Sequence, residues 1–169
     1  STHGFFSPSP KTDYSENYFM GTETKKAVEN PLLRSGLFLT GAETFLNSDD
    51  EKKEEFKENG ILTAYEASQM NLLGTDLVIL SACETGLGEV NNGEGVFGLQ
   101  RGFFGAGAKS VLMSLWKVDD TATKDLMIEF IKNYSTTMNK QKSLRDAQLT
   151  IMKKYPQPYY WGAFVMVGM

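Results

Sequence analysis

The sequence predicts an α/β protein whose layers include a largely parallel sheet. Short apolar runs alternate with segments of helical period, which is the order typical of parallel strands joined by helices. Residues 77–81 form a Leu/Val/Ile run, as expected for a central strand buried on both faces. With 169 residues, of which 41% are hydrophobic, the chain is long enough for one domain with a real core.

The first half contains one strand, one capped helix and two irregular segments. Residues 7–30 show no clear period and indicate a long loop, and residues 36–40 a short strand. The charge-dense run 47–59 is typical of a solvated insertion or a mobile loop. Thr63 followed by Glu66 three places later forms a capping box, which predicts the start of a short helix.

The second half supplies the regular elements of the predicted layers. Glycine interrupts the first helical pattern, in which Val96, Leu99, Phe103 and Phe104 share a face. The expected elements are a helix over 93–107, a strand over 109–115, helices over 121–134 and 142–154, and a last strand over 161–167.

Composition excludes several classes of protein. The net charge of −4 and the scattered lysines argue against direct nucleic-acid binding. No apolar run approaches the roughly 18 residues of a membrane span, and no signal-peptide layout is present. A single cysteine excludes an internal disulfide and suits a reducing compartment, so we expect a cytoplasmic protein.

The one histidine and the one cysteine both occupy positions that suit a thiol hydrolase. Cys83 follows the predicted strand 77–81 at its carboxyl end, where open parallel sheets place their binding crevice. His3 is followed by Gly4, which lets the backbone approach a ligand closely. Because a thiol needs deprotonation and imidazole is its usual base, a Cys–His dyad is the leading hypothesis. The alternatives are a small buried Cys83 and a surface or capping His3.

Several separated motifs follow one another in order along the chain. They begin with Thr2-His3-Gly4-Phe5, Pro31-Leu32-Leu33 and Gly60-Ile61-Leu62-Thr63. The remaining segments are 81–89 around Cys83, 93–99, 106–111, 114–120 and 159–164. This series resembles the CHAT family, caspase-like protease domains commonly found with tetratricopeptide repeats and related to caspases and separase, and Thr2-His3-Gly4-Phe5 is similar to the family's histidine motif. The resemblance runs through the whole chain, 1–169, with gaps at the charged insertion.

The resemblance implies a caspase-like three-layer sandwich with a mainly parallel central sheet, and cleavage of a specific protein substrate. Cys83 would be the nucleophile, His3 would supply and accept protons, and the backbone N–H groups of Gly4 and Cys83 would form the oxyanion hole. His3 and Cys83 would lie at the ends of neighbouring parallel strands. No cofactor is implied.

The family's strands upstream of the histidine have no counterpart here, so we expect position 1 to be a truncation or a processing point. A missing segment or another chain would complete the sheet. The expected partners are a tetratricopeptide-repeat region or N-terminal segment of the same protein and a regulatory partner that controls activity. The loops 7–30 and 47–59 are the candidates for movement on activation.

Three residues after the strand 109–115 are candidates for the substrate-binding groove. A comparable aspartate in separase helps to receive a basic P1 side chain, so Asp119 or Asp120 could line the S1 pocket. Either could instead cap the helix near Thr121. Trp116 could be a groove wall or a core residue. Glu84 could bind a substrate amide or face solvent, whereas Glu94 fits the start of a helix better than a catalytic role.

No zinc-ligand spacing, phosphate loop or dinucleotide fingerprint is present, so neither a metal nor a nucleotide is expected. The leading hypothesis is a caspase-like cysteine endopeptidase. Two alternatives are a catalytically silent caspase-like interaction module and a thiol hydrolase that acts on small esters or amides.

Overall fold

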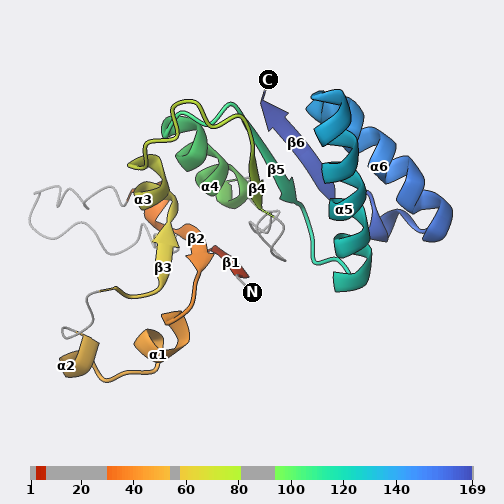
Figure 1. Cartoon of the computed structure of the whole chain (residues 1–169). Helices are drawn as coiled ribbons and strands as arrows, with labels where there is room; N and C mark the ends of the chain where they lie inside the picture. The colour runs from red at the N-terminus through yellow and green to blue at the C-terminus, as the bar shows by residue number, and fades with distance from the viewer. Residues whose placement is uncertain (1–2, 7–29, 54–57, 81–93, 169) are drawn as a thin grey trace, which may run out of the picture.

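The computed structural model describes residues 3–6, 30–53, 58–80 and 94–168 (Figure 1). Their strands form two three-stranded sheets. The first sheet has the order β1-β2-β3 and is antiparallel throughout, and the second has the order β4-β5-β6. In the second sheet β4 is parallel to β5, and β5 is antiparallel to β6. The α/β class is therefore confirmed, whereas a mainly parallel central sheet and the caspase-like sandwich stay predictions.

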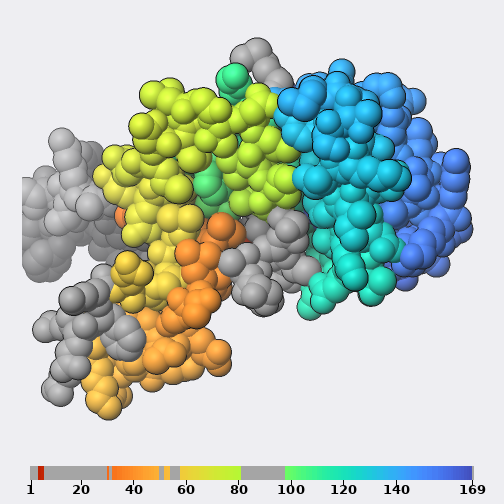
Figure 2. Space-filling view, viewed as in Figure 1, coloured from red at the N-terminus to blue at the C-terminus, as the bar shows by residue number. Residues whose placement is uncertain are grey.

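The first sheet is built from short strands with a long excursion between two of them. The strands are β1 (His3–Phe6), β2 (Ser35–Phe38) and β3 (Ile61–Thr63), and a 3-10 turn, Pro31–Leu33, precedes β2. Between β2 and β3 the chain forms α1 (Ala42–Leu46) and α2 (Asp50–Lys53). Figure 2 shows this orange segment extending away from α5 and α6.

The capping box at Thr63 is confirmed. Thr63 Oγ1 accepts a hydrogen bond from Glu66 N (3.2 Å), and Glu66 Oε2 accepts one from Thr63 N (2.7 Å). These bonds satisfy amides that the first turn of α3 (Ala64–Ser68) leaves unpaired. The helix is short, and Ala64 and Ala67 are fully buried against α4 (Glu94–Gly105).

The second sheet lies between helices on both faces, which gives three layers in this part of the molecule (Figure 1). Its strands are β4 (Val78–Leu80), β5 (Ser110–Ser114) and β6 (Phe164–Gly168). Along β5 the side chains alternate between the two faces. Val111 and Met113 pack toward α4, whereas Leu112 packs toward α5 (Asp120–Thr137) and α6 (Lys140–Lys154).

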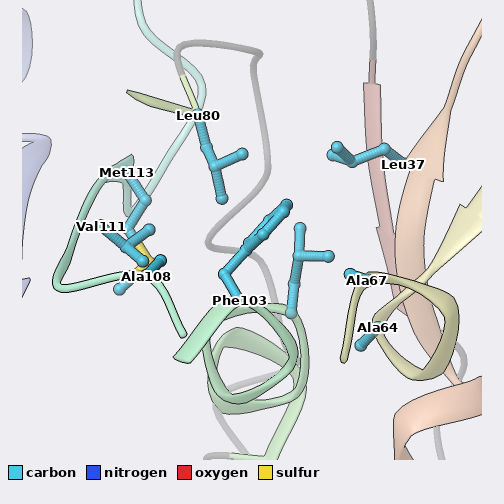
Figure 3. Packing of buried hydrophobic residues seen from close by; sticks show 9 residues of the cluster. Leu37, Ala64, Ala67, Leu80, Phe103, Ala108, Val111 and Met113 are labelled. Atoms are coloured by element: carbon cyan, nitrogen blue, oxygen red, sulfur yellow. The ribbon is translucent and has the colours of Figure 1, made fainter. Parts of the chain in front are cut away.

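Two hydrophobic clusters occupy the two sides of this sheet. The site-side cluster, partly drawn in Figure 3, joins both sheets through α3 and α4; its buried members are Leu37, Ala64, Ala67, Leu80, Leu99, Phe103, Ala108, Val111 and Met113. The helix-pair cluster lies under α5 and α6; its buried members are Leu112, Val118, Leu126, Phe130, Leu144, Ala147, Ile151, Ala163 and Phe164.

Several predicted details differ from the structure. Ile79 is 37% exposed, so β4 is not buried on both faces: among the described strands it pairs only with β5 and lies at a sheet edge. The last strand begins at Phe164 because residues 158–160 form a 3-10 turn that continues to Gly162, whose N–H donates to Pro158 O (2.7 Å). Part of the segment 47–59 forms α2, and most of the predicted loop 7–30 lies outside the described residues.

Within the described part of the chain, no helix combines the length and the apolar character needed to cross a membrane.

Candidate active site

His3 and Gly4 are the first residues of β1, and β2 sets their place. In this antiparallel pair the Cα atom of His3 lies opposite that of Phe38, and Gly4 lies opposite Leu37. The sequence-based expectation placed His3 at the end of a strand parallel to the nucleophile strand. In the structure His3 is the first residue of β1, and β1 runs antiparallel to β2. A four-residue strand is too short to give a period signal, so β1 was not predicted.

A pair of stacked rings joins β1 to β2. The ring centroids of Phe5 and Phe38 are 4.5 Å apart and the ring planes differ by 24°. Phe5 lies opposite Gly36, and a Cβ atom at that glycine would lie 2.8 Å and 2.9 Å from two carbons of the Phe5 ring. The absence of a side chain at Gly36 therefore leaves the space that the Phe5 ring occupies.

Cys83 and Glu84 lie outside the described residues, which stop at Leu80 in β4 and resume at Glu94. Leu80, three residues before Cys83, is buried in the site-side cluster, and so is Leu37, the residue opposite Gly4. Figure 3 shows Leu80 and Leu37 on opposite sides of Phe103 in this cluster. One core therefore supports both the strand that leads to the cysteine and the strand pair that carries the histidine.

Trp116 follows β5 at the edge of the second sheet where the parallel strands β4 and β5 both end. Leu80 pairs with Met113 in the parallel register, and Cys83 and Trp116 are each three residues further on (83 − 80 = 116 − 113 = 3). The indole is half-buried against the helix-pair cluster, and its Nε1–H donates to Tyr159 O (3.1 Å). Trp116 thus packs on the core, and its place at this edge leaves a role as a groove wall open.

Asp119 caps α5, as one of the two sequence interpretations proposed. Its Oδ1 atom accepts a hydrogen bond from Ala122 N (2.9 Å). Asp120 is the first residue of α5, and both aspartates are exposed. Glu94 is the first residue of α4, as expected for a helix-start residue. No described contact tests the S1 role of Asp119 or Asp120.

Three polar residues near β1 are buried, and the sequence did not reveal them. Arg34 and Ser35 at the start of β2, and Gln100 in α4, are 8%, 2% and 9% exposed. The Ser35 hydroxyl has no hydrogen-bond partner among the described groups, and a Cβ atom at Gly98 would collide with it. Polar residues are mostly exposed, so composition gives no signal for such burial. The position of Ser35 shows how closely α4 approaches β2.

A second polar cluster lies at the other end of β4, away from Cys83. Tyr134 Oη donates to Asp76 Oδ2 (2.8 Å), and Lys140 Nζ is 3.2 Å from Asp76 Oδ1. Lys140 also donates to Ser110 Oγ (2.8 Å). The hydrogen bond from Tyr134, and then that from Lys140, lower the pKa of the Asp76 carboxyl, and the same carboxylate raises the pKa of Tyr134. This cluster ties α5 and α6 to the start of β4.

Metal binding was not expected from the sequence. Among the described side chains no group of three or more His, Cys, Asp or Glu residues could hold a metal ion.

The family model described as "CHAT domain" matches residues 1–169, the whole chain. The chain belongs to the CHAT domain family. As a family, CHAT domains are caspase-like peptidases. The chain is also 30% identical over 110 residues to "Tetratricopeptide repeat protein 28" of Mus musculus and 29% identical over 110 residues to the protein of that name in Homo sapiens.

Each alignment with these relatives covers 64% of this chain but 4% of the relative. The chain therefore corresponds to a small part of much longer proteins that are named for tetratricopeptide repeats, which fits the association expected from the sequence. No solved structure matches the chain.

Proposed function

We propose that this CHAT domain is a cysteine endopeptidase that cleaves a specific protein substrate through Cys83 and His3. The observation that carries the proposal is the shared core: Leu80, just before Cys83, and Leu37, opposite Gly4, belong to one buried cluster. The shared core supports the proposal because Leu80 lies three residues before the only cysteine of the chain and Leu37 pairs with the residue after its only histidine. Membership of the CHAT domain family, which consists of caspase-like peptidases in general, supports peptide-bond cleavage as the proposed reaction.

In the proposed reaction the Cys83 thiol passes its proton to His3, and the sulfur attacks the carbonyl carbon of the scissile peptide. The N–H groups of Gly4 and Cys83 donate to the oxygen that gains negative charge. The C–N bond breaks as His3 gives that proton to the leaving amine, and a thioester to Cys83 remains. Water then adds its hydroxyl to the acyl carbon, the C–S bond breaks, and the proton of the water passes by way of His3 to the sulfur.

The proposed substrate groove follows the carboxyl ends of β4 and β5. Trp116 and Asp119 come directly after β5, at the edge from which the segment to Cys83 also leaves. Open α/β sheets bind ligands at this edge of parallel strands. We place Asp119 or Asp120 in the S1 pocket, where an exposed carboxylate would favour a basic P1 side chain.

We also propose that a partner regulates the domain in the cytoplasm. The occurrence of similar sequence in proteins named for tetratricopeptide repeats supports such a region as the partner. The segments 7–30 and 47–59 would rearrange on activation. Hydrogen exchange of these segments should change when the repeat region is added, and unchanged exchange would contradict this regulation.

The dyad is tested with a panel of peptidyl electrophiles that differ in P1, followed by mass spectrometry of the intact protein. The proposal predicts one adduct, at Cys83, with preference for basic P1, and loss of labelling in Cys83→Ala. His3→Ala should slow labelling, while the control Lys153→Ala, at an exposed position near the end of α6, should not. Equal labelling of wild type and His3→Ala by all probes would favour a silent interaction module. Turnover of small esters without peptide cleavage would favour another thiol hydrolase.

A further inference from the structure

The place of His3 depends on a very short strand with few contacts. β1 has four residues and lies at the edge of its sheet among the described strands. Short two-stranded pairings have little stability of their own in water, so side-chain contacts must set the register. A slip of two residues would keep the same faces but would move His3 by the length of a dipeptide along β2.

The described side-chain contacts that resist such a slip converge on the Phe5 ring, which packs over Gly36 and stacks on Phe38. Phe38 lies opposite His3, and its ring stacks on the ring of Phe5, the second residue after His3. Phe5 in turn lies over Gly36, two residues before Phe38. The aromatic ring and the glycine therefore form a complementary pair that fits one register only.

The space at Gly36 is closed from the other side as well. A Cβ atom there would collide with the carbonyl oxygen of Leu62 in β3, in addition to the Phe5 ring. A side chain at position 36 would therefore collide with atoms of both neighbouring strands, β1 and β3. Opposite a residue that bears a side chain, the Phe5 ring would not find the same space. Phe38 is half-buried in this arrangement and is not a member of either core cluster.

We infer that Phe38 is a positioning residue: through its stack on Phe5 across Gly36, it holds β1 in the register that sets the position of His3. The effect of Phe38 on the register of β1 does not depend on the proposed function. Only the expected effect on catalysis rests on it. Phe38 itself touches no substrate in this account and acts through His3.

The chain offers an unusually direct test because it contains one histidine and one cysteine. Cross-strand nuclear Overhauser contacts between residues 3–6 and β2, and hydrogen exchange of the amides of residues 4–6, are compared in wild type, Phe38→Leu, Phe38→Tyr and Leu39→Ala. Phe38→Leu keeps an apolar side chain but removes the ring, Phe38→Tyr keeps the stack, and Leu39→Ala changes an adjacent, 40% exposed residue.

We expect Phe38→Leu to speed exchange of the β1 amides by about 3- to 10-fold, as loss of one aromatic cross-strand pair implies. It should also weaken the cross-strand nuclear Overhauser contacts that join residues 3–6 to their partners in β2, while Phe38→Tyr and Leu39→Ala match wild type. Unchanged cross-strand contacts in Phe38→Leu would overturn the inference. So would an equal change in Leu39→Ala, because the effect would then reflect general loosening.

Labelling of Cys83 by a peptidyl electrophile separates this inference from the proposed function. If both hold, Phe38→Leu slows the maximal labelling rate by a similar factor and leaves the half-saturating probe concentration unchanged. If the cross-strand contacts of β1 respond to Phe38 but labelling depends on neither Phe38 nor His3, the positioning role stands and the dyad fails. If labelling depends on His3 but not on Phe38, the positioning inference fails and the dyad stands.

Discussion

The two hydrophobic clusters on either side of the second sheet are built in different ways. The helix-pair cluster draws its members from one stretch of chain, Leu112 to Phe164, and is centred on large residues such as Phe130 and Leu126. The site-side cluster gathers residues from Leu37 to Met113 and brings helices together over Ala64 and Ala67. The comparison suggests a division of roles: the first cluster supplies most of the stability, and the second sets the geometry of the site.

The largest expected effect comes from removing the central ring of the helix-pair cluster. Phe130 is fully buried, so Phe130→Ala should lower the free energy of unfolding by about 3–5 kcal/mol through lost burial and a cavity. Ile128→Ala on the same helix is the control; its side chain is 56% exposed, and its effect should stay within about 0.5 kcal/mol. Urea unfolding measures the free energy of unfolding of both variants. Similar losses in Phe130→Ala and Ile128→Ala would contradict the stabilising role assigned to the helix-pair cluster.

In the site-side cluster, the close packing of α4 on α3 should respond to added volume. A Cβ atom at Gly102 of α4 would collide with the carbonyl oxygen of Ala64 in α3, so Gly102→Ala should cost about 1–3 kcal/mol. Gly105→Ala is the matched control, because its Cβ atom would make ordinary contact with Ser68 Cβ at 3.7 Å.

The two glycine variants also sharpen the division of roles. Gly102→Ala should slow the labelling of Cys83 by a peptidyl electrophile under conditions in which the protein stays folded. The reason is that α4 packs against both sheets, so a shift of α4 would change how they are placed. Wild-type labelling in a folded Gly102→Ala protein would show that this cluster does not set the site geometry.

A smaller effect distinguishes the two roles of Asp119. Asp119→Ala removes the cap on α5 and should cost about 1 kcal/mol, whereas asparagine caps equally well and Asp119→Asn should leave stability nearly unchanged. If the carboxylate also lines S1, Asp119→Asn should lose the preference for basic P1 probes. Retained preference in both Asp119→Asn and Asp120→Asn would remove these residues from the pocket.

The smallest expected effect is a pH dependence at the start of β4. Tyr134 and Lys140 lower the pKa of Asp76 below 3.8, so the folded state favours the ionised carboxyl. The resulting stability is present above about pH 3.8 and is lost as the pH falls through the lower folded pKa. Asp76→Asn should therefore lower Tm at neutral pH and reduce the acid-induced fall, while Asp146→Asn, on the exposed surface of α6, should not. Parallel Tm curves for wild type and Asp76→Asn would contradict this.

The sequence predicted the elements whose signals are local. The cap at Thr63, the fully buried strand β5 and the helices α5 and α6 follow from capping residues and apolar periods that neighbours along the chain determine. Even there, Ile128 and Ile131 are exposed although both are apolar, because Leu126 and Phe130 occupy the face toward the sheet.

The remaining features depend on contacts between distant segments. The antiparallel pairing of β1 with β2, the burial of Ser35 under α4 and the stack of Phe5 on Phe38 join residues at least 29 positions apart in the chain (35 − 6 = 29). The direction of β1 and the edge position of β4 could not be read from composition or period, because both patterns fit parallel and antiparallel neighbours alike. For the candidate site, the sequence identified the one cysteine and the one histidine as candidates. The structure adds the core shared by Leu80 and Leu37 and the register of β1 on β2.

The central claim is that the only imidazole and the only thiol of the chain share one site, and a paramagnetic label tests it most directly. A nitroxide is attached to Cys83, and the NMR signals of the His3 imidazole are compared before and after reduction of the label. The account predicts that the signals are broadened beyond detection while the label is oxidised and return on reduction. Imidazole signals that keep their full intensity beside the oxidised label would place the two groups far apart and contradict the account.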